Sequence, residues 1–317
     1  MQSSDRIPLL LILGPTAAGK SRLGLEVAEA LGGEIVSADA FAVYRGLDIG
    51  TDKPSIEARR RVRHHLVDVV DPAERFSAGA FASAAEKAID DIRSRDKVPL
   101  VVGGTHFYTR ALLLGLFPTP PHDPELSTGL IEEWERDPAA VHRRLLEVDP
   151  TSAKRIGPRD RQRLLRALEV FELTGEPLPT HWNRQEVRSK FASLLTAPRH
   201  SRADLYARIN ARVDNMFASG LIEEVERILA SGVPSGAHAL KAIGYRQVVE
   251  MLEGKTDLGT AIDLTKRSSR KLAKRQLTWL RNLREGTLHW VATANEGGAS
   301  EIVDLWDRHT KEILGEK

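Results

Sequence analysis

The first third of the chain alternates mostly apolar runs with segments of helical spacing. The runs have the length of buried parallel strands and cover residues 9–13, 35–36, 66–70 and 98–102. Apolar residues recur at helical spacing in two segments of this region: Leu23, Val27 and Leu31, then Phe81, Ala85, Ala88 and Ile92. Strands that alternate with helices predict an α/β fold, with an open, mostly parallel sheet covered by helices on both faces.

Prolines interrupt this alternation at residues 117–124 (FPTPPHDP), which we interpret as a linker. The chain that follows is charged and has a helical pattern, so residues 117–186 are predicted to form a helical insertion. Residues 1–116 and 187–317 would then form the core. In its second part we expect strands at 191–196 and 288–291, with long amphipathic helices between 202 and 284.

The composition excludes several kinds of chemistry. The 317 residues include no cysteine, so disulfides, thiol nucleophiles and cysteine-ligated zinc are ruled out. The ten histidines show no metal-ligand spacing. The longest uncharged apolar run near the start, residues 7–19, is too short to span a bilayer, so we expect a cytoplasmic protein with no membrane partner.

Positive charge is concentrated in three segments although the net charge is only +2. Residues 266–284 hold eight Lys or Arg and no acid, and residues 142–166 hold eight against three acids. A third cluster lies at residues 59–63. One such cluster alone is usually a solvated helix face, but three together favour a polyanionic partner, most plausibly a nucleic acid.

Residues 14–21 read GPTAAGKS and match the phosphate-loop pattern between an apolar strand and a helix. Lys20 would neutralise the terminal phosphate, and the Ser21 hydroxyl would ligate Mg²⁺. The loop therefore predicts a site for a diphosphate or a triphosphate, ATP included. Its predicted binding residues are Gly14, Pro15, Thr16, Ala17, Ala18, Gly19, Lys20 and Ser21.

The acid that usually holds Mg²⁺ in ATPases and GTPases is missing after the strand at 98–102, where Gly103, Gly104 and Thr105 follow instead. The one acid at the tip of an early core strand is Asp39. On its own it is as well explained as a turn or cap residue. Beside a phosphate loop, it is also a candidate general base facing a second substrate.

Eight segments, in order, resemble the tRNA dimethylallyltransferase family. They comprise residues 14–21, 37–54 (SADAFAVYRGLDIGTDKP), 64–72, 99–116 (PLVVGGTHFYTRALLLGL), 160–175, 208–225, 241–247 (KAIGYRQ) and 271–281 (KLAKRQLTWLR). The resemblance implies a P-loop, nucleoside-kinase-like core with an inserted helical domain. It also implies transfer of a dimethylallyl group from dimethylallyl diphosphate to N6 of adenosine 37 of a tRNA, next to the anticodon, by a monomeric enzyme.

Carried over by motif, the resemblance makes Asp39 the general base on the exocyclic amine. It assigns stabilisation of the leaving diphosphate to Lys20, to Ser21 through Mg²⁺, to Thr105 and to Arg212. The implied tRNA contacts are Asp39, Ala40, Phe41, Ala42, Gln162, Arg163, Leu164, Leu165, Arg166, Lys241, Tyr245, Arg246, Lys274, Arg275 and Arg281.

The chain departs from the family pattern at two places. Ala40 and Ala42 replace a usual Ser and Gln, which affects how the adenine edge is held rather than the general base Asp39. His106 and Phe107 stand where a small or apolar pair is usual, and we expect them to reshape the wall around the prenyl tail. Trp279 could stack on a splayed base, although its spacing with Leu277 and Leu280 is more typical of a core residue.

Two other functions remain open from the residues. A P-loop kinase for a small molecule or nucleotide would share the core, but it would leave the basic segment 266–284 without a task. An RNA-binding protein with a nucleotide switch would leave Asp39 unexplained.

Overall fold

The computed structural model describes residues 6–117, 119–183 and 190–315. The chain divides into two compact units, the first formed by Met1–Leu114 and Ser189–Lys317, the second by Gly115–Arg188. The predicted helical insertion falls within the second unit, while its predicted boundary at residues 186 and 187 lies outside the described residues. Among the described helices, none combines the length and apolarity needed to cross a bilayer.

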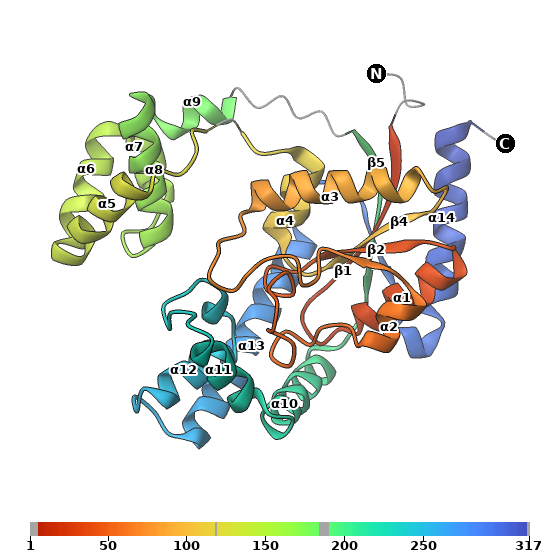
Figure 1. The fold of residues 1–317 in the computed structure, drawn as a ribbon. Helices are drawn as coiled ribbons and strands as arrows, with labels where there is room; N and C mark the ends of the chain where they lie inside the picture. The colour runs from red at the N-terminus through yellow and green to blue at the C-terminus, as the bar shows by residue number, and fades with distance from the viewer. Residues whose placement is uncertain (1–5, 118, 184–189, 316–317) are drawn as a thin grey trace. The chain divides into compact units, whose positions relative to one another are not determined.

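The first unit is built on a parallel sheet (Figure 1). In the described residues it has six strands in the order β3-β2-β4-β1-β5-β6. Five residues of β1 are fully enclosed, and β2 and β4 are buried along their whole length, as expected of strands covered on both faces. The strands are β1 (Ile7–Leu13), β2 (Glu34–Ala38), β3 (His64–His65), β4 (Pro99–Gly103), β5 (Phe191–Pro198) and β6 (Leu288–Val291).

Alternate residues of the strands enter two different cores. Leu9 and Leu11 pack against α3 (Ala78–Arg93) and α4 (His106–Leu114), whereas Leu10 and Ile12 pack against α1 (Lys20–Ala30) and α14 (Gly298–Leu314). Figure 1 shows these helix pairs on opposite faces of the sheet. The short helix α2 (Ile56–Arg61) precedes β3. The predicted α/β class with a doubly covered parallel sheet is therefore confirmed.

A helical group follows β5 in the same unit (Figure 1). Val225 and Val248 belong to a buried cluster that also encloses Tyr44 and Leu47 from the loop after β2. That loop is thereby fixed to the helical group rather than to the sheet alone. The helices are α10 (Arg202–Ala218), α11 (Leu221–Ala230), α12 (Tyr245–Leu252) and α13 (Leu258–Arg281), with short 3₁₀ turns at Ala239–Lys241 and Ala294–Glu296.

The second unit is helical and has a core of its own. Asp123, Asp137 and Asp149 each cap a helix through the side chain, and a proline follows each as the first helical residue. Leu145, Leu164 and Leu168 lie in its buried cluster. Its helices are α5 (Pro124–Arg136), α6 (Pro138–Val148), α7 (Pro150–Arg155), α8 (Arg161–Thr174) and α9 (Leu178–Asn183).

Two expectations about elements were wrong or incomplete. The predicted strand at residues 66–70 does not form, because Leu66 and Asp68 adopt positive φ angles of 60° and 58°, and the paired strand is His64–His65 instead. The terminal helix α14 was not predicted from the sequence. Its Ile302 and Trp306 are buried against the sheet.

Candidate active site

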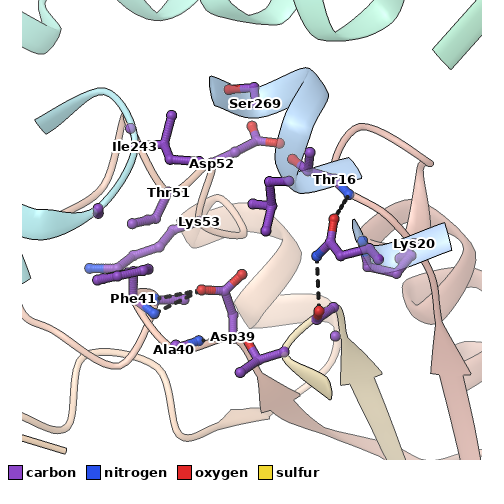
Figure 2. A pocket seen from close by; sticks show the side chains of 18 of the residues that line it. Thr16, Lys20, Asp39, Ala40, Phe41, Thr51, Asp52, Lys53, Ile243 and Ser269 are labelled. Atoms are coloured by element: carbon purple, nitrogen blue, oxygen red, sulfur yellow. Dashed lines mark hydrogen bonds between the residues drawn. The ribbon is translucent and has the colours of Figure 1, made fainter. Parts of the chain in front are cut away.

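A cavity of about 880 Å³ opens at the carboxyl edge of the sheet in the first unit. The phosphate loop after β1, Asp39 after β2 and the turn after β4 all line it, because parallel strands end at the same edge. Helices α10 and α13 and the loop around residue 243 complete the wall. Figure 2 shows Thr16, Lys20, Asp39 and Asp52 around this space.

The phosphate loop closes on the first turn of α1. Gly19 caps this helix with a φ of 76°, a left-handed conformation that glycine adopts without steric cost. Lys20 Nζ donates to the carbonyl oxygen of Pro15 at 2.7 Å. Burial lowers the pKa of Lys20 to about 8, while the negative charge of Asp39 opposes this shift and the positive charge of Arg212 adds to it. Lys20, Asp39 and Arg212 therefore form one electrostatic group.

Helix α10 supplies cations to the same loop. Arg212 Nη1 donates to Thr16 Oγ1 at 2.9 Å, and its Nε lies 3.6 Å from Asp52 Oδ2. One turn earlier, Arg208 Nε donates to the carbonyl oxygen of Ala17 at 2.8 Å. The sequence prediction missed Arg208, although its spacing of four residues from Arg212 places both on one helix face.

Asp39 combines the two roles that the sequence left open. Its Oδ1 accepts hydrogen bonds from the backbone N–H groups of Phe41 at 2.8 Å and Ala42 at 3.2 Å, which makes it a turn residue. Within the described part of the chain, Oδ2 takes part in no hydrogen bond or ion pair, and the residue lines the cavity. One carboxylate oxygen thus fixes the loop while the other remains available as a proton acceptor.

Thr105 connects Asp39 to the end of β4. Its Oγ1 accepts from the N–H of Ala40 at 3.0 Å, and its own N–H donates to the carbonyl oxygen of Ala38 at 3.2 Å. The Thr105 hydroxyl oxygen therefore holds the backbone beside Asp39. Its hydrogen remains free to turn toward the cavity, which Thr105 lines.

A second network holds the loop between Asp39 and Pro54. Lys53, which was not singled out from the sequence, donates to Tyr44 O at 2.6 Å, to Asp48 at 2.7 Å and to Asp68 at 2.5 Å. The side chain of Lys53 is only 2% exposed. Tyr44 and Asp48 belong to the same loop as Lys53, whereas Asp68 comes from the segment after β3, so Lys53 ties the loop to that segment.

The pair that departs from the family pattern has two different environments. His106 stacks on Trp279 of α13, with ring centroids 4.0 Å apart and planes 14° from parallel. Burial, with a smaller effect of Lys20, lowers the pKa of His106 to about 4, so the ring is neutral at physiological pH. Phe107 is 60% exposed at the cavity wall. Trp279 is partly buried, packed against the sheet core and covered on one face by His106.

The predicted tRNA-contact residues of the first unit divide by exposure. Lys241, Arg246, Lys274, Arg275 and Arg281 are exposed, and of these Lys241, Arg246 and Arg275 also line the cavity. Their role in tRNA binding stays a prediction.

Tyr245 corrects part of that prediction, whereas Ala42 does not. Tyr245 is fully buried and donates to Glu224 at 2.5 Å while accepting from the N–H of Gly50, so it supports the loop and offers no surface for direct contact. Burial, followed by the charge of Glu224, raises its pKa. Ala42 is 4% exposed but lines the cavity, so its role in tRNA contact stays a prediction.

In the second unit the predicted contact segment lies at the start of α8. Gln162 and Arg163 are exposed, whereas Leu164 and Leu165 belong to the core of that unit and cannot act as contact side chains. Arg166 is paired with Glu169 at 2.6 Å and with the carbonyl oxygen of Pro120 at 2.7 Å. Arg163 Nε lies 3.5 Å from Asp160 Oδ2, so both predicted contact arginines already have an acidic neighbour within the unit.

This combination of a phosphate loop, cations from a neighbouring helix and a strand-tip carboxylate defines a P-loop-type α/β enzyme. The sequence matches the family described as IPP transferase over residues 42–283. The chain belongs to this family and is a prenyltransferase rather than a kinase.

Individual relatives agree along nearly the whole chain. The tRNA dimethylallyltransferase of Thermomicrobium roseum is 42% identical over 98% of this chain and 93% of its own length. That of Halorhodospira halophila is 48% identical over 88% and 91%.

Solved structures show the same fold. The full-length tRNA isopentenylpyrophosphate transferase of Bacillus halodurans is 35% identical, with a TM-score of 0.71 over 96% of this chain and 97% of that protein. A eukaryotic dimethylallyltransferase acting on tRNA is 27% identical, with a TM-score of 0.80 over 94% and 77%.

Proposed function

We propose that this enzyme transfers the dimethylallyl group of dimethylallyl diphosphate to N6 of adenosine 37 of a tRNA, giving N6-(dimethylallyl)adenosine and diphosphate. The observation that carries the proposal is that a proton-accepting carboxylate, Asp39, and the Lys20–Arg212 pair line one cavity. The relatives named as tRNA dimethylallyltransferases support the choice of both substrates.

The chemistry follows from the positions of these groups. The N6 lone pair forms a C–N bond to the allylic carbon of the donor, the C–O bond to the diphosphate breaks, and its electron pair leaves with the diphosphate. The N6 proton moves to Asp39 Oδ2. The leaving group gains negative charge, which the phosphate-loop N–H groups, Lys20 and Arg212 stabilise, with Thr105 as a further donor.

The residues present fit a magnesium ion, which we propose as the cofactor. Ser21 is exposed in the cavity, in the first turn of α1. No group of three or more acidic or histidine ligands is found in the described residues, so the protein would supply few ligands. Mg²⁺ commonly binds in this way, because it keeps several waters and takes phosphate oxygens from the substrate. When bound, the ion would neutralise charge on the diphosphate.

The exposed Lys241, Arg246, Lys274, Arg275 and Arg281 support tRNA as the acceptor, because phosphate contacts require accessible cations. In the second unit, Gln162 and Arg163 are the exposed candidates. The family resemblance implies a monomer, and we propose that the enzyme acts as a monomer in the cytoplasm.

The direct test is to incubate the protein with tRNA lacking the modification, dimethylallyl diphosphate and Mg²⁺, and to analyse the digested nucleosides by mass spectrometry. We expect adenosine to gain one dimethylallyl unit, with the site mapped to residue 37 by fragment analysis. A parallel reaction with ATP in place of the donor should leave the RNA unchanged. Consumption of ATP with no prenylated nucleoside in either reaction would overturn the proposal.

A further inference from the structure

One side chain of α13 connects two turns that carry different parts of the site. Gln276 is 6% exposed, and its Oε1 accepts from the N–H of Thr16 at 2.8 Å. Its Nε2 donates to the carbonyl oxygen of Gly104 at 2.8 Å. Figure 2 draws the bond at Thr16 as a dashed line. A single buried amide thus bridges the phosphate loop and the end of β4.

One of the two turns lies beside the group that meets the leaving diphosphate, and the other lies beside the general base. On one side, Thr16 also accepts from Arg212, a cation proposed to meet the leaving diphosphate. On the other, Gly104 is followed by Thr105, whose hydroxyl holds the N–H of Ala40 beside Asp39. Hydrogen bonds and the short backbone links Gly104–Thr105 and Asp39–Ala40 therefore connect the leaving-group side to the general base through Gln276.

Glutamine suits this place because its amide has both an acceptor and a donor. Glutamate would present an oxygen to the Gly104 carbonyl, and methionine would leave the Thr16 N–H and that carbonyl without their partner. Packing also restricts the residue at position 104, where the amide of Gln276 approaches the backbone closely. A Cβ added to Gly104 would lie 2.6 Å from Gln276 Nε2 and 2.9 Å from the carbonyl oxygen of Gly14.

We propose that Gln276 is a positioning residue that sets the distance between the diphosphate half of the site and Asp39. This inference rests on the proposed function, since it assumes transfer between a donor on the phosphate loop and an amine beside Asp39. Gln276 itself is not required to touch either substrate. The same helix exposes Lys274, Arg275 and Arg281, so a tRNA bound to these cations would be held by the element that also fixes the two halves.

The test is single-turnover prenyl transfer by Gln276→Met and Gln276→Glu with both substrates saturating. A misplacement of about 1 Å costs about 10²-fold in rate, so we expect a fall of roughly 10- to 100-fold. The Kd for tRNA should stay within about twofold of the wild-type value, since the phosphate contacts are intact. A general loss of structure would instead weaken tRNA binding and lower Tm together with the rate.

Thr278→Ala is the matched control on the same helix, because Thr278 is exposed. Among the described residues, its hydroxyl bonds only to the carbonyl oxygen of Lys274, within α13. Its saturated rate should equal that of the wild type. A wild-type rate in either folded Gln276 variant would overturn the positioning role, and Gln276→Glu serves if Gln276→Met does not fold. Failure of the wild-type enzyme to transfer any prenyl group would instead overturn the proposed function.

Discussion

Replacing Asp39 with asparagine separates the two tasks of this residue. The asparagine carbonyl can accept the same hydrogen bonds from Phe41 and Ala42 as Oδ1 does, so the turn should be preserved. Only the second oxygen changes, from a proton acceptor to an amide NH₂. The fold and most of the tRNA affinity should therefore remain, while proton removal from N6 is lost.

The expected cost is a fall of about 10²–10⁴ in the single-turnover rate, the usual contribution of a general base. The neighbouring Ala40 and Ala42 have no polar side-chain group that could take the proton, which favours the larger end of this range. The assay is prenyl transfer at saturating donor, with tRNA binding measured on the same variant.

Asp52 provides a matched control within the same cavity. It lines the wall and lies near Arg212, and its φ of 56° is one that asparagine tolerates well. Asp52→Asn should therefore fold normally and lower the single-turnover rate by less than about tenfold, well below the share of a general base. A near-wild-type rate for Asp39→Asn, or a larger loss for Asp52→Asn, would refute the assignment of the base to Asp39.

Three further outcomes are expected. Because the pKa of Lys20 is lowered to about 8, its positive charge is present below that pH and lost above it, so kcat/KM for the donor should decline as pH rises through 8. Lys20→Arg should remove this decline, and a wild-type profile that stays flat through this range would contradict the prediction. Neutralising Lys274, Arg275 and Arg281 together should weaken tRNA binding. The magnitude of the slope of log binding constant against log salt concentration should fall by roughly 0.7–0.9 for each lost phosphate contact. An unchanged slope in the folded variant would mean that the three side chains are simply solvated. Tyr245→Phe should lower the free energy of unfolding by about 1–3 kcal/mol and leave tRNA affinity unchanged, because buried Glu224 and the Gly50 N–H lose their partner. Unchanged stability in denaturant unfolding, together with weaker binding in a tRNA titration, would contradict this supporting role.

The features that the sequence predicted well are those encoded by consecutive residues. The phosphate loop is one contiguous motif, and strands such as β1 and β4 are continuous apolar runs because both faces of the sheet are covered. Residues 66–70 (LVDVV) are also mostly apolar but do not form a strand. The reason lies in backbone conformation, since Leu66 and Asp68 adopt positive φ angles that hydrophobicity does not reveal.

A motif also mixes residues with different tasks, and its letters do not separate them. In KAIGYRQ, Lys241 and Arg246 are exposed at the cavity, whereas Tyr245 is sealed inside and bonded to Glu224. The resemblance assigned Lys241, Tyr245 and Arg246 alike to tRNA contact. Burial divides them into candidate contacts and a support for the loop at residues 48–50, and only the three-dimensional structure supplies that division.

The connection between the phosphate loop and the turn after β4 could not be predicted from the sequence for a further reason. Gln276 and Thr16 are 260 positions apart, and a glutamine inside a strongly basic helix looks like one more polar residue of a solvated face. Its burial against Gly104 gives it a different meaning, because a buried amide must have its hydrogen bonds satisfied. In this site, the groups proposed to do chemistry lie in recognisable motifs. The hydrogen bonds that connect those motifs come from Gln276, which lies in the segment 271–281, but that segment does not reveal its role.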